Sequence, residues 1–180
     1  MSSSLPGISC LVFSEEMEST QNTAKALAEE GAENGTLVWA RKQKAGRGRM
    51  ERTWESPDGG LYFSLILRPR LSPKVLAKLS LKTAEAVSTA LLKTSSIETK
   101  IKPPNDIYAK EKEVWKKISG ILIEAAGNES RLFWLVIGIG VNVNNRPQLE
   151  SATSLKVLTG KDWELKKVLS QILEEMAKWD

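Results

Sequence analysis

The chain has 180 residues, 41% of them hydrophobic and 27% charged, which is the composition of a globular domain with a full core rather than of a disordered or fibrous chain. It contains no histidine and one cysteine, so histidine general bases, Ser/His triads and histidine or thiolate zinc sites are excluded. The net charge of +4 is compatible with an anionic ligand or an acidic protein partner. Any chemistry must therefore depend on lysine, arginine, carboxylates and amides, with a metal such as Mg²⁺.

The chain shows no sign of membrane insertion or secretion. Its longest apolar run, residues 132–141, is interrupted by two glycines and is far shorter than the roughly 20 residues needed to span a bilayer. The opening segment MSSSLPG lacks the basic and apolar parts of a secretory signal. The single Cys10 cannot form an internal disulfide. We therefore expect a soluble protein of the reducing cytoplasm with no membrane partner.

Three apolar runs bounded by turn residues predict strands in the first 70 residues: 8–13, 35–43 and 60–69. A helix should follow the first run, capped by Ser19 or Thr20 and ended by Gly31. The second and third strands are joined by a loop rich in arginine, lysine and glycine.

Residues 71–93 predict the most regular helix, with Ser72 as its cap and Pro73 in its first turn. Residues 98–110 are expected to form two short extended pieces around a double proline. Two strands joined by a hairpin turn are expected next: 117–126 and 131–144. Asp162 is expected to cap a last helix, whose apolar face contains Leu165, Val168, Leu169, Ile172, Leu173 and Met176.

These elements predict an α+β fold, with a mixed, mostly antiparallel central sheet and helices packed on it. We find no internal repeat, low-complexity tract or linker, so we expect a single domain over residues 1–180.

The segment ARKQKAGRGRMERTW, residues 40–54, has the composition of a phosphate-binding loop. Glycines alternate with Arg47 and Arg49, so the backbone can turn sharply while guanidinium groups project outward, and such groups bind phosphates well. It is not a P-loop, because no Lys-Ser/Thr follows, and Glu51 breaks the G-x-G-x-x-G pattern. Taken alone, the loop is better explained as a solvated hairpin tip.

Three further stretches favour a ligand site. In KPPNDI, prolines fix the backbone beside Lys102, Asn105 and Asp106. In KKISGILIE, Lys117 lies three residues before a glycine at the head of a strand. In GIGVNVN, alternate glycines leave a slot where a flat group can approach the backbone. Taken singly, a solvated strand end explains the lysine equally well, and a bulge or tight core crossing explains the glycines.

A resemblance to the catalytic domain of biotin protein ligases covers nearly the whole chain. It rests on five stretches in this order: MESTQ, QKAGRGRMERTWESPDGGLYFSLILRP, KPPNDI, KKISGILIE and GIGVNVN. The resemblance implies the fold of the biotin/lipoate ligase catalytic domain, which is like that of class II synthetases. It also implies an ATP-dependent ligase that joins biotin to AMP as biotinyl-5′-AMP, releases pyrophosphate, and passes biotin to one lysine of a biotin carboxyl carrier domain.

The resemblance implies roles for individual residues. Those that match the family's biotin-binding positions are Ser19, Thr20, Gln43, Gly46, Arg47, Lys117 and Gly120. Those that match its ATP and adenylate positions are Arg47, Arg49, Arg52, Trp54, Lys102, Asn105 and Asn142. Lys117 matches the catalytic lysine, Arg49 matches a loop arginine at the phosphates, and Asp106 is the candidate that orients the acceptor amine.

This chemistry agrees with a chain that lacks histidine. A carboxylate that attacks the α-phosphate needs no general base, only positive charge on the phosphates and in-line positioning. Arginines, Lys117 and Mg²⁺ would supply the charge, although the sequence does not indicate which residues hold the metal. Because the adenylate hydrolyses in water, the basic loop is also expected to act as a lid.

Two positions depart from the family pattern: Glu51 stands where glycine is common, and Pro103 replaces the tryptophan of KWPND. The insertion EKEVWK lengthens the stretch before Lys117. The sequence shows neither the N-terminal helix-turn-helix nor the C-terminal β-barrel of many relatives, so we expect a catalytic domain without a nucleic-acid partner. A homodimer is compatible with the resemblance.

Three other functions remain open. A lipoate or octanoate ligase of the same superfamily shares the sheet and the lysine, and a non-catalytic relative would bind biotin without turnover. The basic loop could instead bind RNA or DNA, but only Trp39 and Trp54 offer stacking beside it.

Overall fold

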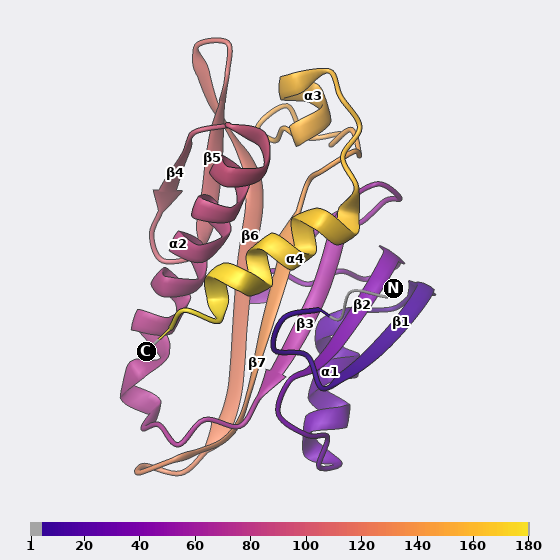
Figure 1. Cartoon of the computed structure of the whole chain (residues 1–180). Helices are drawn as coiled ribbons and strands as arrows, with labels where there is room; N and C mark the ends of the chain where they lie inside the picture. Colours follow the sequence, from indigo (N-terminus) through magenta and orange to yellow (C-terminus); the bar gives the residue numbers. More distant parts are fainter. Residues whose placement is uncertain (1–4, 180) are drawn as a thin grey trace.

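The structure is a computed structural model that describes residues 5–179. A seven-stranded sheet forms its centre, with helix α1 on one face and helices α2 and α4 on the other (Figure 1). The strands lie in the order β1-β2-β3-β7-β6-β5-β4. Strands β1 and β2 are parallel, and each other neighbouring pair is antiparallel. The predicted α+β fold with a mixed, mostly antiparallel sheet is therefore confirmed.

The strands are β1 (Cys10–Met17), β2 (Thr36–Gln43), β3 (Leu61–Leu67), β4 (Thr99–Lys102), β5 (Asp106–Glu111), β6 (Val114–Gly127) and β7 (Leu132–Val141). The helices are α1 (Thr20–Glu29), α2 (Leu76–Ser95), α3 (Leu155–Thr159) and α4 (Leu165–Met176). Two short 3-10 turns lie at Arg49–Glu51 and Pro73–Val75.

Two of the predicted helix starts are confirmed. The Ser19 hydroxyl caps α1 by accepting from the Asn22 amide at 3.4 Å, and Gly31 follows the helix with a left-handed φ of 97°. The Ser72 hydroxyl accepts from the Lys74 amide in the 3-10 turn that leads into α2.

The predicted cap of the last helix is wrong. Helix α4 begins after Glu164, whose side chain makes no capping hydrogen bond. The Asp162 carboxylate instead accepts from the Lys156 ammonium at 2.7 Å. Lys156 belongs to the short helix α3, which was not predicted from the sequence and which brings the lysine close to Asp162. The Asp162 carboxylate therefore pairs with this lysine and does not cap α4.

The first strand is longer than its apolar pattern predicts. Residues Ser14, Glu16 and Met17 continue the parallel pairing with the end of β2. Because β1 is an edge strand of the sheet, its polar side chains can remain in solvent while the backbone is still paired. A prediction from hydrophobicity alone therefore placed the end of this strand too early.

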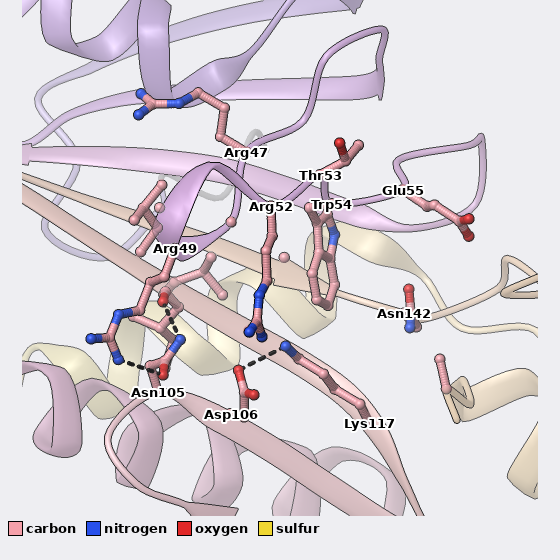
Figure 2. A pocket seen from close by; sticks show the side chains of 18 of the residues that line it. Arg47, Arg49, Arg52, Thr53, Trp54, Glu55, Asn105, Asp106, Lys117 and Asn142 are labelled. Atoms are coloured by element: carbon pink, nitrogen blue, oxygen red, sulfur yellow. Dashed lines mark hydrogen bonds and ion pairs between the residues drawn. The ribbon is translucent and has the colours of Figure 1, made fainter. Parts of the chain in front are cut away.

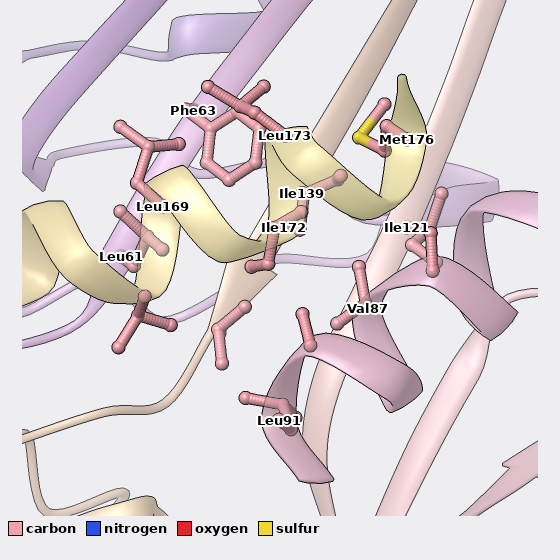
Figure 3. Close-up of a cluster of buried hydrophobic side chains, with 14 of the residues drawn as sticks. Leu61, Phe63, Val87, Leu91, Ile121, Ile139, Leu169, Ile172, Leu173 and Met176 are labelled. Atoms are coloured by element: carbon pink, nitrogen blue, oxygen red, sulfur yellow. The ribbon is translucent and has the colours of Figure 1, made fainter. Parts of the chain in front are cut away.

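The main hydrophobic core lies between the sheet and helices α2 and α4 (Figure 3). The predicted apolar face of α4 is confirmed, because five of its members are buried: Val168, Leu169, Ile172, Leu173 and Met176. A smaller core lies under α1 and consists of Ala24, Ala28, Val38, Ile66, Trp134 and Val136. Small alanines let this helix approach the sheet closely. No helix within residues 5–179 is both long and apolar enough to span a bilayer.

Candidate functional site

A cavity of about 480 Å³ opens where the loop between β2 and β3, residues 44–60, lies over strands β6 and β7. Its wall combines the start of α1, this β2–β3 loop, the turn between β4 and β5, both strands and residues 145–152. Five cationic side chains line it against two carboxylates: Arg47, Arg49, Arg52, Lys102 and Lys117 against Glu55 and Asp106. Such an excess of positive charge favours an anionic ligand.

Glycines form the floor of the cavity. Gly120 on β6 lies opposite Gly140 on β7, and the indole of Trp54 rests on both. A Cβ atom added at Gly140 would lie 2.5 Å from the Trp54 Nε1, and one at Gly120 would lie 3.0 Å from its Cζ3. The flat group that fills the slot in this structure is therefore the chain's own tryptophan. Its buried Nε1 has no hydrogen-bond partner in the described part of the chain.

An ion pair lies at the centre of the cavity (Figure 2). The Lys117 ammonium is 2.7 Å from a carboxylate oxygen of Asp106 and 5.3 Å from the centroid of the Trp54 ring. The side chains are 30% and 24% exposed, so both partners can reach an entering ligand. The backbone of Lys117 is held by hydrogen bonds to Ser151 and Thr153, which fixes the point from which the ammonium extends.

Two arginines of the β2–β3 loop face this ion pair. Arg49 donates to the Asn105 side-chain oxygen at 3.0 Å, and the Asn105 amide nitrogen donates to the Ile121 carbonyl at 3.0 Å. The Arg52 guanidinium points toward Asp106 and Lys117 in Figure 2. Cations from the loop and from β6 therefore meet on one side of the cavity, an arrangement that stabilises negative charge on a ligand.

Hydrogen-bonded side chains form a polar wall near the start of α1. The Gln43 oxygen accepts from the Thr20 amide at 2.7 Å, and its nitrogen donates to the Ser56 hydroxyl at 2.7 Å. The Ser64 hydroxyl lies 3.0 Å from acceptors on both Thr20 and Gln21. Because these groups are already held in place, they are preorganised to recognise a polar ligand.

Of the residues that the resemblance implies, Ser19 and Gly46 do not line the cavity, and Arg47 lines it but bonds to residues on its far side. Ser19 is fully buried and caps α1, and Gly46 lies behind the wall, with its carbonyl accepting from the Trp54 amide at 2.8 Å. The Arg47 side chain points away from Lys117 in Figure 2 and donates to Glu124 and Asn22.

The nucleotide positions implied by the resemblance lie along the cavity wall. Asn142 follows β7, and its side-chain oxygen accepts from Asn145 at 2.9 Å. The Lys102 ammonium lies 5.9 Å from the centroid of the Tyr108 ring. Arg49, Arg52, Trp54 and Asn105 line the same cavity, so these side chains surround one continuous space.

Two departures from the family pattern have local structural consequences. Met50 and Glu51 are consecutive left-handed residues with φ of 53° and 59°, a conformation that favours glycine. The family's glycine position is therefore occupied here by a strained glutamate. The inserted residues lengthen the β5–β6 hairpin, where Trp115 pairs with Lys110 and is 42% exposed.

Several residues of the wall were not predicted from the sequence: Gln21, Ser64 and Asn145. Glu124, which accepts from Gln21 beside the wall, was not predicted either. Ser64 had a detectable signal, because it is the one polar residue in the apolar strand LYFSLIL. Glu124 also had one, since it follows Gly120 at an even spacing on the same strand and so shares its face. The contacts of Gln21 depend on the tertiary structure.

No group of three or more Cys, Asp or Glu side chains within residues 5–179 is arranged to hold a metal ion. The cavity's carboxylates are Glu55 and Asp106, and the second is paired with Lys117. The described residues therefore do not form a dedicated metal site.

Comparison with known proteins gives consistent matches over this region. The model of the biotin/lipoate A/B protein ligase family matches residues 13–142. The bifunctional ligase/repressor BirA of Bacillus subtilis is 41% identical over 170 residues, which are 91% of this chain and 51% of BirA. The biotin--[acetyl-CoA-carboxylase] ligase of Paracoccus denitrificans is 36% identical over 132 residues, 72% of this chain and 53% of the ligase.

The fold is also similar to solved structures. Biotin protein ligase from Aquifex aeolicus in complex with biotin and ATP superposes with a TM-score of 0.79 and 38% identity, covering 95% of this chain and 70% of the ligase. The chain thus spans about half the length of the two sequence relatives and more of this structural relative.

Proposed function

The chain belongs to the biotin/lipoate A/B protein ligase family, and on this premise we propose that it is an ATP-dependent biotin protein ligase. It activates biotin to biotinyl-5′-AMP with release of pyrophosphate, and it then transfers biotin to one lysine of a biotin carboxyl carrier domain. The relatives named for biotin ligation and the Aquifex complex with biotin and ATP support this proposal.

One observation carries the proposal furthest: cationic side chains lie on one side of the cavity and a neutral polar wall lies near α1. The ion pair of Lys117 and Asp106, together with the loop arginines, suits phosphates and a reacting carboxylate. The wall formed by Thr20, Gln43 and Ser64 suits an uncharged hydrogen-bonding group. Biotin presents both kinds of group, a carboxylate at one end and a ureido ring at the other.

In the first step, a carboxylate oxygen of biotin attacks the α-phosphorus of ATP, and pyrophosphate leaves. The nucleophile is already ionised, so no proton is moved. Lys117, Arg49 and Arg52 stabilise the negative charge that accumulates on the phosphates, and the glycine floor seats Trp54 beside them. Removing such a cation typically slows this kind of step by orders of magnitude.

In the second step, the neutral amine of the acceptor lysine attacks the acyl carbon of the mixed anhydride, and AMP leaves. The acceptor enters as an ammonium group and gives one proton to solvent to become this amine, and its nitrogen gives a second proton to solvent in forming the amide. Asp106 is the carboxylate nearest to Lys117, so it can orient the incoming ammonium group if Lys117 turns toward the phosphate. The acceptor is a carboxylase carrier domain in this proposal, as the name of the Paracoccus relative suggests.

The polar wall favours biotin over lipoate or octanoate. Gln43 and Thr20 already hydrogen-bond within the protein, and each keeps capacity for a further hydrogen bond. A ureido ring can use that capacity, whereas an apolar tail would displace water from these groups without replacing its hydrogen bonds. A site built for hydrogen bonds rejects an analogue that lacks them. Biotin is therefore the acid that we propose.

Magnesium enters this proposal as part of the nucleotide substrate. Mg²⁺ in nucleotide enzymes is commonly held by phosphates, waters and one or two carboxylates rather than by a protein cage. The residues described here form no such cage, so we assign no step to a metal held by the protein.

The test is mass spectrometry of the acyl-adenylate after the protein is mixed with ATP, Mg²⁺ and biotin, lipoate or octanoate in parallel. We expect biotinyl-5′-AMP alone, and biotinylation of one lysine once a carrier domain is added. Lys117→Ala serves as the control for adventitious product.

Each contrary result identifies another function. Adenylates of lipoate or octanoate would show that the chain is a lipoate or octanoate ligase and that biotin is not its substrate. Biotin binding without any adenylate would indicate a non-catalytic relative, and binding of RNA or DNA that weakens steeply with salt would favour the nucleic-acid alternative.

A further inference from the structure

Glu124 on β6 accepts hydrogen bonds from three side chains that belong to two other segments. Gln21 and Lys25 of α1 donate at 3.0 Å and 2.9 Å, and Arg47 of the β2–β3 loop donates at 3.1 Å and 3.4 Å from its two terminal nitrogens. Each nitrogen of Arg47 contacts a different carboxylate oxygen. This two-pronged geometry is the strong and directional form of an arginine–carboxylate pair.

The carboxylate is well suited to hold its partners. Its side chain is only 21% exposed, so solvent screens the ion pairs less than it would at the surface. Burial by itself raises the pKa of Glu124, but the hydrogen bonds from Lys25 and Gln21 and the charge of Arg47 outweigh it and lower the pKa. Glu124 is therefore ionised at neutral pH.

The tip of the β2–β3 loop, residues 47–52, depends on few contacts. Its backbone hydrogen bonds run within the loop, as in the bond from the Gly48 amide to the Arg52 carbonyl. In the described part of the chain, its hydrogen bonds to the rest of the protein come from two side chains, Arg47 and Arg49. The Arg49 bond goes to a neutral amide at an exposed position, so the pair with Glu124 is the stronger attachment.

We propose that Glu124 is a positioning residue that anchors the β2–β3 loop over the cavity through Arg47. The anchor determines where Arg49, Arg52 and Trp54 meet a ligand, although Glu124 itself does not touch the reacting atoms. Anchoring is a property of the ligand-free chain, whereas its consequence for adenylate formation rests on the proposed function.

The first test is limited trypsin digestion of the free protein, with fragments mapped after Arg47, Arg49 and Arg52. Glu124→Gln keeps the shape of the side chain but removes its charge. We expect cleavage of the loop to accelerate on the order of tenfold, the change that corresponds to losing a charge-assisted hydrogen bond when opening is in rapid equilibrium. Glu124→Asp should recover part of the protection.

Glu175→Gln is the matched control. Glu175 is 8% exposed and accepts from Lys93 and Lys178 at 2.8 Å each, but it lies on α4, on the opposite face of the sheet. Its substitution should leave loop cleavage unchanged. If Glu124→Gln leaves the cleavage rate at the wild-type value, or if the control accelerates it equally, Glu124 is not the anchor.

A second comparison isolates the partner. In an Arg47→Ala background the anchor is already broken, so Glu124→Gln should not further accelerate cleavage after Arg49 or Arg52. An equal acceleration in both backgrounds would show that Glu124 acts through α1 and would overturn the proposal.

The kinetic test separates positioning from direct catalysis. Because the ligand must order a loosened loop, Glu124→Gln should raise KM for biotin on the order of tenfold while kcat for adenylate formation changes by less than about twofold. A fall in kcat with unchanged KM would refute the positioning role. If the wild-type protein forms no adenylate, the proposed function fails, while the digestion result still decides whether Glu124 anchors the loop.

Discussion

Replacing Gly140 with alanine tests whether the indole of Trp54 is seated on the glycine floor. The added Cβ would lie 2.5 Å from Nε1 and 2.6 Å from Cε2 of the indole, whereas carbon atoms in ordinary contact are about 3.5–4.0 Å apart. The indole must therefore shift by about 1 Å or leave the slot. Overpacking of this kind costs about 1–3 kcal/mol, which lowers Tm by about 2–12 °C in a chain of this size.

Urea denaturation of a double-mutant cycle measures this effect. In a Trp54→Ala background the slot is empty, so Gly140→Ala should change the free energy of unfolding by less than about 0.5 kcal/mol. The coupling between the two positions should then be about 1–3 kcal/mol. Gly138→Ala is the control, because its Cβ would meet the side chain of Gln21 instead, and its effect should add to that of Trp54→Ala. Additivity between Gly140 and Trp54 would show that the indole does not occupy the slot.

Four further predictions concern the cations of the site, the cap of helix α1, the turn at Glu51 and Glu175 on helix α4. Lys117→Ala and Arg49→Ala should each slow adenylate formation at least about tenfold with an unchanged circular dichroism spectrum, and a wild-type rate would remove that residue from the mechanism. Ser19→Ala should lower the free energy of unfolding by about 1 kcal/mol in urea titration, since it removes the cap of α1; no change would mean that the cap is dispensable. Glu51→Gly should raise stability by about 1 kcal/mol by relieving a φ of 59°, and the idea fails if the midpoint in urea falls. Hydrogen bonds from two lysines lower the pKa of Glu175 below its usual 4.5. Its ionised form therefore stabilises the fold above that pH, and this stability is lost as the pH falls through the lowered pKa. Glu175→Gln should be less stable than wild type at pH 7, and denaturation curves of the two proteins should converge in acid.

Much of the fold could be predicted because its signals are local. The cap at Ser19, the turn at Gly31 and the Ser72-Pro73 start depend on the conformational preferences of a few adjacent residues. The predicted cap at Asp162 was wrong because the Asp162 carboxylate pairs with Lys156, which helix α3 brings close. The end of β1 was missed because an edge strand pairs through its backbone whatever its side chains are.

The sequence by itself determined which chemistry is available and where its motifs lie along the chain, because glycines, arginines and a lysine in short continuous stretches carry that information. Only the tertiary structure decided which of these side chains meet. Arg47 bonds to Glu124, which is 77 positions away, and Trp54 rests on glycines of two strands that the sheet order places side by side. Local preferences extend over a few residues, whereas these contacts depend on strand pairing and burial between distant segments.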